Sequence, residues 1–180
     1  MAFAVTLLFE SDIATAIVSR WLRLAAAGVS RSMLDLSYPP HVSLVVHDGP
    51  IDGGTAVTLD RVFAQVNRMA VTLTGVMTFG AGSGVCYAAL APSPDLMGLH
   101  ATTVNAVGGA CRPHYQTGCW TPHCTLATNM SDREMGRANA ILEKDWLPLE
   151  GFFETAELVE FAPVVRVRSW ALAPRSTRTP

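Results

Sequence analysis

Positive charge is scarce in this chain. Of its 180 residues 16% are charged, the net charge at pH 7 is −2, and Lys144 is the only lysine. We therefore expect no broad positive field of the kind that grips long duplexes, and any phosphate contact from a basic side chain must come almost entirely from arginine. A small nucleotide or an RNA end is the better-fitting partner.

Long apolar runs are also missing. Charged residues such as Glu10, Arg20 and Arg23 interrupt the candidates before the roughly 18 residues that a membrane helix needs. Residues 1–9 lack the positive start and the small-residue cleavage site of a signal peptide, and they read better as a strand. We expect a cytoplasmic protein without a membrane span.

No C-x-x-C pair occurs among the cysteines. The four cysteines are Cys86, Cys111, Cys119 and Cys124. Without a signal peptide, disulfides are not expected. Cys111, His114, Cys119 and His123 fall within 13 residues, so a zinc-stabilised binding protein is one alternative, although their spacing matches no standard zinc finger. We predict no metal site.

Apolar periodicity predicts an α+β protein. Hydrophobic residues make up 49% of the chain, which suits one globular domain over residues 1–180. Apolar and alternating runs predict strands near residues 2–9, 41–46, 70–79, 85–90, 122–127, 152–161 and 165–172. Helical spacing and cap signals predict helices that open at Ser11, near residue 59, at Ser93 and at Ser131.

The order of elements repeats within the chain. Each half reads strand, helix, strand, helix, strand, and a shift of 82 residues places His41 on His123 and Ser43 on Thr125. We interpret this as a duplicated, two-lobed β-α-β-α-β domain with mainly antiparallel sheets around a central cleft. The predicted lobes cover residues 1–80 and 85–175.

The repeated positions carry acid–base chemistry. Side chains alternate along a strand, so His41 and Ser43 face one way, as do His123 and Thr125. Hydrolysis of a cyclic phosphate needs one group to deprotonate water and one to protonate the leaving sugar oxygen, and two imidazoles can do both near neutral pH. The two hydroxyls can bind the non-bridging oxygens.

Both copies read Pro-His-x-(Ser/Thr)-Leu, at residues 40–44 and 122–126. This paired H-x-(S/T)-x motif resembles that of the two-histidine (2H) phosphoesterase superfamily, which includes the 2′-5′ RNA ligase-like proteins and the RNA cyclic phosphodiesterases. The resemblance spans nearly the whole chain. It implies a bilobal fold and hydrolysis of 2′,3′-cyclic phosphate or 2′-5′ phosphodiester ends without a metal or other cofactor. Relatives often carry a basic residue soon after the second motif, where this chain has Thr128.

Other side chains near the motifs are candidates for substrate contacts. Tyr38, Tyr115 and Trp120 precede the two motifs and could stack on a base, and Arg112 could contact phosphate. Two further alternatives stay open beside the zinc-stabilised protein. One is a nucleotide- or RNA-binding module of the same fold with little catalysis, and the other is a 2′-5′ RNA ligase. The sequence gives no oligomeric state.

Overall fold

The computed structural model of the protein describes residues 1–80, 82–108 and 111–174. The strands are β1 (Ala2–Phe9), β2 (His41–Asp48), β3 (Met69–Thr78), β4 (Cys86–Leu90), β5 (His123–Ala127), β6 (Leu149–Phe161) and β7 (Val165–Ala171). The helices are α1 (Ser11–Ala26), α2 (Ser32–Asp35), α3 (Gly53–Phe63), α4 (Pro94–Ala106), α5 (Asp132–Glu143) and a short 3₁₀ helix, Pro113–Tyr115. The predicted α+β class is confirmed.

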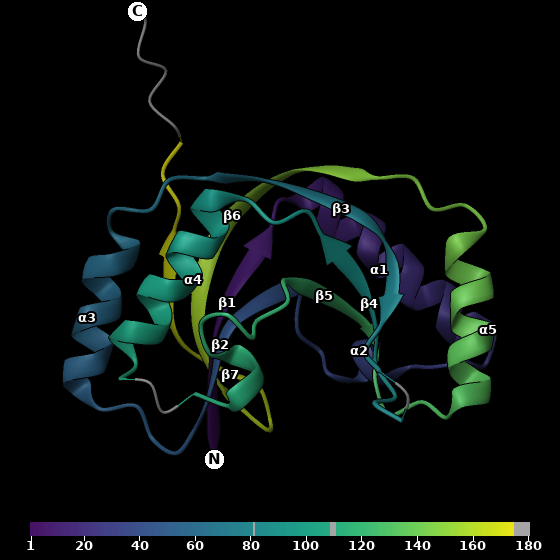
Figure 1. The fold of residues 1–180 in the computed structure, drawn as a ribbon, viewed down its shortest axis with the longest axis horizontal. Helices are drawn as coiled ribbons and strands as arrows, with labels where there is room; N and C mark the ends of the chain where they lie inside the picture. The colour runs from purple at the N-terminus through teal and green to yellow at the C-terminus, as the bar shows by residue number, and fades with distance from the viewer. Residues whose placement is uncertain (81, 109–110, 175–180) are drawn as a thin grey trace, which may run out of the picture.

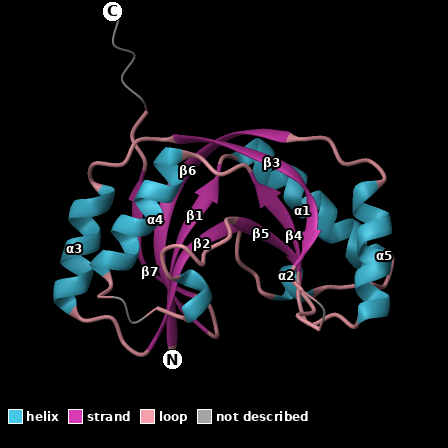
Figure 2. Cartoon of the chain, viewed as in Figure 1, coloured by secondary structure: helices cyan, strands magenta, loops and turns pink. Residues whose placement is uncertain are grey.

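One antiparallel sheet contains the seven strands. Its order is β2-β1-β6-β3-β4-β5, and β7 pairs with β6 beside this path. The long strand β6 pairs along one edge with β1, and along the other edge first with β3 and then with β7. Strand β6 therefore joins the two halves of an arched sheet, which lies between two groups of helices (Figures 1 and 2).

The helices pack across the two halves of the sequence. Helices α3 and α4 lie on one side and α1 and α5 on the other (Figure 1). Helix α1, from the first half, contacts α5 and β5, whereas α4, from the second half, contacts β2. The repeat thus exchanges helices between its halves in a way that the predicted lobe ranges, 1–80 and 85–175, do not describe. Within the described part of the chain, no helix combines the length and apolar character needed to cross a membrane.

Local sequence explains most element boundaries. Helix α1 buries the stripe Ile13, Ile17, Trp21 and Leu24 against the core, as its spacing predicts. The Ser93 side chain caps α4, and Ser131 and Glu134 form the predicted capping box of α5. Ser11 begins α1 but is not its cap, because the cap position is Glu10, which makes no side-chain cap bond.

Helix α2 lies in the segment after α1 that the sequence indicates as a polar loop. With four residues it is little more than one turn, so no apolar stripe can mark it in the sequence. Strand β2 also runs on to Asp48, beyond the predicted end at Val46. Both features matter for the candidate site, because Ser32 and Met33 of α2 line its cavity and Asp48 bonds to Arg112, which also lines it.

Candidate active site

The two motif strands meet where the two ends of the arched, open sheet approach each other. Strands β2 and β5 are the two ends of the sheet order, yet they contact each other. The Cys124 thiol, which points away from the His123 side of its strand, interacts with the backbone N–H of His41. The curvature of the sheet therefore brings together two motifs that lie 82 positions apart in the sequence.

Both histidine rings are fixed in the same way. Nδ1 of His41 lies 2.8 Å from the carbonyl oxygen of Pro39, and Nδ1 of His123 lies 2.7 Å from that of Thr121. A carbonyl oxygen only accepts, so Nδ1 carries the hydrogen and donates in both cases. In the neutral rings Nε2 then holds the lone pair, and in the protonated rings it holds the proton that can be given away.

Aromatic neighbours enclose both half-buried imidazoles. Tyr38 meets His41 edge-on at 4.9 Å between ring centroids, and Phe79 meets His123 at the same distance. Burial lowers the pKa of His41 below its usual 6.5, the Pro39 carbonyl opposes this shift, and the charge of His123 adds to it. Burial likewise lowers the pKa of His123. Each ring is therefore biased toward its neutral form in the free protein.

Two tryptophans hold the backbone of the hydroxyl-bearing residues. The Trp120 indole donates to the Ser43 carbonyl at 3.0 Å, and the Trp21 indole donates to the Thr125 carbonyl at 3.2 Å. In each pair the tryptophan and its acceptor come from opposite halves of the sequence. The two motifs are thus supported by matching hydrogen bonds, one from the loop before β5 and one from α1.

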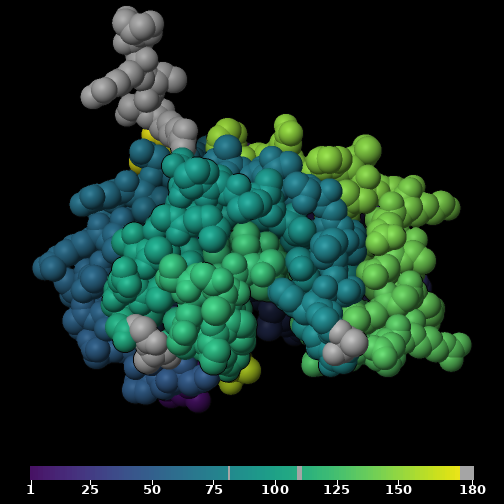
Figure 3. All heavy atoms as spheres, in the orientation of Figure 1, coloured from purple at the N-terminus to yellow at the C-terminus, as the bar shows by residue number. Residues whose placement is uncertain are grey.

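A cavity of about 290 Å³ opens at these strands. Its lining includes His41, Ser43, Thr125 and Thr128, together with Tyr38, Tyr115 and Arg112. His123 and Trp120 are not among the described residues that line it. In the space-filling view the surface is indented between the left and right halves of the molecule (Figure 3). Most of the predicted site residues therefore share one cavity.

Tyr38 is anchored by a buried carboxylate that sequence reasoning missed. Its hydroxyl donates to Glu157 Oε2 at 2.8 Å and also bonds with Thr6 Oγ1. Glu157 is only 2% exposed and also pairs with Arg166 at 2.6 Å. Burial raises the pKa of Tyr38, so the phenol stays neutral. An acid between apolar neighbours in β6 was the available signal, since buried charges are normally paired.

Tyr115 and Trp120 differ in what they offer a substrate. Tyr115 lines the cavity, burial raises its pKa, and a hydrogen bond with the Ser43 side chain opposes that shift. Trp120 is buried, and its ring stacks on His100 at 4.1 Å with an interplanar angle of 4°. The predicted base stacking on Trp120 therefore has no open ring face on the His100 side, and the structure gives this residue a supporting contact to Ser43 instead.

The structure does not group the cysteines and histidines that the zinc alternative requires. Across the described ranges no three histidine, cysteine or acidic side chains are grouped closely enough to hold a metal ion. Cys111 is buried whereas Cys119 is exposed. The 3₁₀ helix that contains His114 lies between them in the chain.

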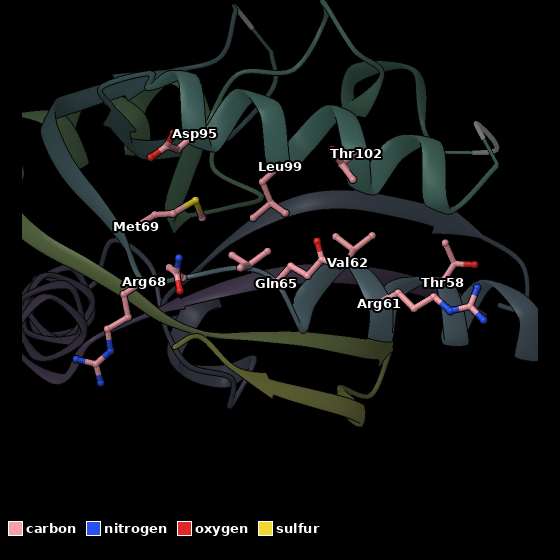
Figure 4. A pocket seen from close by; sticks show the side chains of 11 residues that line it. Thr58, Arg61, Val62, Gln65, Arg68, Met69, Asp95, Leu99 and Thr102 are labelled. Atoms are coloured by element: carbon pink, nitrogen blue, oxygen red, sulfur yellow. The ribbon is translucent and has the colours of Figure 1, made fainter. Parts of the chain in front are cut away.

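A larger cavity of about 820 Å³ lies elsewhere, between α3 and α4 (Figure 4). Leu99 and Thr102 border it from α4, and Thr58 and Arg61 from α3. None of the predicted site residues is among the described residues that line it. Size alone therefore does not identify the active site, and the paired motifs favour the smaller cavity.

Solved structures with this fold include E. coli LigT and a protein described as a phosphoesterase. E. coli LigT complexed with 3′-AMP aligns with a TM-score of 0.64 at 16% identity, over 94% of this chain and 97% of that one. A structure described as a phosphoesterase aligns with a TM-score of 0.63 at 14% identity, over 95% and 97% of the two chains. TT0787 of Thermus thermophilus aligns with a TM-score of 0.62 at 14% identity, over 97% and 100%. These likenesses show the fold.

The search of curated proteins finds no match. A family model does match, over residues 15–162, and this range contains both histidine motifs and the whole cavity-forming part of β2 and β5. The resemblance expected from the paired motifs is confirmed: this chain belongs to the 2′-5′ RNA ligase superfamily.

Proposed function

We propose that this protein is a metal-independent phosphodiesterase that hydrolyses 2′,3′-cyclic phosphate or 2′-5′ phosphodiester ends of nucleotides or RNA. Membership of the superfamily supports an enzyme that acts on phosphodiester bonds. The observation that carries the finer proposal is the matched pair of histidines, each with Nδ1 bound to a backbone carbonyl and Nε2 left for proton transfer. Catalytic histidines need this fixed tautomer.

The reaction needs one neutral and one protonated ring. The neutral imidazole takes a proton from water while the water oxygen bonds to phosphorus. The bond from phosphorus to the 2′ or 3′ oxygen breaks, and the other imidazole gives its proton to that oxygen. The product is a phosphate monoester beside a free hydroxyl. The ligase alternative uses the same two rings with a sugar 5′-hydroxyl in place of water: its oxygen bonds to phosphorus, the bond to the 3′ oxygen breaks, and a 2′-5′ phosphodiester forms.

Ser43 and Thr125 serve the phosphoryl group in this proposal. Their hydroxyls donate hydrogen bonds to the non-bridging oxygens, on which charge grows in the transition state. Both residues line the cavity, and the tryptophan bonds to their carbonyls hold the backbone in place. Donors that are already positioned cost little reorganisation during the reaction.

Small nucleotides are the ligands we propose. E. coli LigT has been solved with 3′-AMP, with NADP+ and with ATP, and this chain has the same fold. The cavity of about 290 Å³ is just below the usual range for small-ligand sites, roughly 300–1,000 Å³. It therefore suits the terminal part of a nucleotide chain better than a duplex.

The direct test is turnover in the presence of a chelator. Purified protein is incubated with EDTA and a panel of 2′,3′-cyclic nucleotides and 2′-5′ dinucleotides, and the product isomers are identified. We expect turnover of at least one substrate, and the isomer shows which sugar oxygen leaves. Tight binding without turnover would instead support the binding-module alternative. Activity that appears only after metal is added back would overturn the metal-independent mechanism.

The pH dependence should distinguish the free enzyme from its complex. Burial lowers the pKa of both His41 and His123 below 6.5, and the pair must carry one proton to react. The kcat/KM profile should therefore be bell-shaped, with the midpoint of its alkaline limb below about pH 6.5. A bound phosphate anion favours the protonated ring, so the kcat bell should lie at higher pH. A kcat/KM optimum above about pH 7.5 would contradict this assignment.

A further inference from the structure

Arg112 marks the far end of the cavity from His41. Its backbone N–H donates to the Val46 carbonyl at 2.8 Å, which places it beside the second half of β2. A β-bulge shortens β2 at this point, so Val46 and Ser43 lie opposite Ala4 and Thr6, two residues apart on β1 and about 7 Å at 3.3 Å per residue. A hydrogen bond spans about 3 Å. Arg112 can therefore share the phosphate that Ser43 holds only if its side chain turns back toward Ser43.

Contacts at the guanidinium hold that side chain in the opposite direction. Its Nε and Nη2 atoms donate to the Asp48 carboxylate at distances from 2.8 to 3.2 Å, and Asp48 ends β2 on the side away from His41. The guanidinium carbon lies 5.9 Å from the centre of the Phe161 ring, and Phe161 also lines the cavity. The cation is thus fixed at the end of the cavity, one apolar segment away from the predicted catalytic histidine.

Arg112 keeps donors for an anion. A guanidinium has five N–H groups, and the hydrogen bonds within the described ranges occupy Nε and Nη2 but not Nη1. Its side chain is 38% exposed. Among the described residues that line the cavity, Arg112 is the only lysine or arginine. Apart from a protonated catalytic histidine, a phosphate that enters this cavity finds its cationic partner in Arg112, at the far end.

We propose that Arg112 forms a second phosphate subsite, so that the preferred substrate carries another phosphate one nucleoside away from the reacting one. The inference rests on the proposed phosphodiesterase function and adds the substrate class. An RNA end with a terminal 2′,3′-cyclic phosphate has this second phosphate on the 5′ side of its last nucleoside. A simple cyclic mononucleotide lacks it. The apolar stretch of the cavity between the two subsites, which includes Val46 and Phe161, accommodates the nucleoside.

Asp48 orients the Arg112 guanidinium but also weakens its attraction for a second phosphate. The carboxylate fixes the guanidinium plane, and its negative charge opposes a second anion at the same place. Asp48→Asn retains a hydrogen-bond acceptor for Arg112 and removes the repulsion. This variant should lower KM about threefold for substrates with a second phosphate, and the gain should fade at high salt because both groups are partly exposed.

Three substrates separate the reacting phosphate from the second one. They are a 2′,3′-cyclic mononucleotide, the same nucleotide with an added 5′-phosphate, and a dinucleotide that ends in the cyclic phosphate. Arg112→Gln should raise KM about tenfold for the latter two and leave the first unchanged, with kcat little altered in all three. Equal effects on the second and third substrates would assign the subsite to the phosphate itself, as proposed, rather than to the additional nucleoside.

Arg31→Gln is the matched control. Arg31 is another exposed arginine paired with a carboxylate, Asp35, but it does not line the cavity among the described residues. It should leave KM unchanged for all three substrates. An Arg112→Gln effect that is absent, or equal for the mononucleotide and the dinucleotide, would overturn the subsite.

Failure of the proposed function has a different signature. The wild-type protein would then turn over none of the three substrates. Equilibrium binding of the same three molecules would still decide the role of Arg112. We expect the wild-type protein to bind the mononucleotide most weakly of the three. Arg112→Gln should lose this preference for the two molecules with a second phosphate. Equal binding of all three by the wild-type protein would overturn the subsite without reference to catalysis.

Discussion

His41→Ala and His123→Ala are each expected to lower kcat by about 10²–10⁴-fold, the usual contribution of a positioned acid or base. Both rings are held by a backbone carbonyl, and each would supply one of the two proton transfers. The fold should survive, because both side chains are only half-buried and lie at the start of their strands. Steady-state kinetics on the best substrate of the panel, with circular dichroism to check folding, measures the effect.

The double variant and a third histidine complete the experiment. His41→Ala/His123→Ala should be scarcely slower than either single variant, since residues that act in one concerted step are strongly non-additive. His47→Ala is the control, because His47 lies on the same strand and its Nδ1 also contacts a carbonyl, that of Gly49. It should retain nearly the wild-type kcat. Folded single variants that keep near-native turnover of every accepted substrate would show that the two-histidine mechanism is wrong.

Removal of the motif hydroxyls should cost less. Ser43→Ala and Thr125→Ala are each expected to lower kcat about 10-fold to 10³-fold, which corresponds to about 1.4–4 kcal/mol of transition-state stabilisation. Each change deletes one hydrogen bond to the developing charge but leaves proton transfer in place. The loss should therefore appear in kcat more than in KM.

The repeat provides the conservative controls for these hydroxyls. Because one copy uses serine and the other threonine, Ser43→Thr and Thr125→Ser each keep the donor that the partner motif already employs. Both should recover most of the activity that the alanine variants lose. If the alanine variants matched the wild-type kcat, the hydroxyls would have no part in stabilising the transition state.

Local sequence patterns predicted the parts of this protein whose cause is local. The α+β class and the family follow from periodicity and from the paired motifs, and the Ser131 capping box marks the start of α5 because its bonds span three residues. The grouping of His41 with Thr125 in one cavity could be anticipated only from the repeat. The catalytic roles stay a prediction.

Contacts between distant segments could not be predicted from such local patterns. The stripe that contains Trp21 predicts a buried face, but periodicity cannot say that the indole meets the Thr125 carbonyl. The position of Trp120 before the second motif suggested base stacking, whereas His100, from α4, occupies one face of the ring. The burial of Glu157 is explained only by its contacts with Tyr38 and Arg166, which come from other segments of the chain. Each of these depends on how the halves of the sheet and the helices come together.

The crossed tryptophan bonds couple assembly of the site to assembly of the whole molecule. Trp120 and Ser43 are 77 residues apart, and Trp21 and Thr125 are 104 apart, so each bond closes a long loop. Loop-closure entropy makes such contacts slow to form and leaves them unsupported in a partly folded chain. A fragment with a single motif therefore lacks the indole that holds its backbone. A half of the chain folded alone would therefore lack a complete motif, because the hydrogen bond that supports each motif comes from the other half.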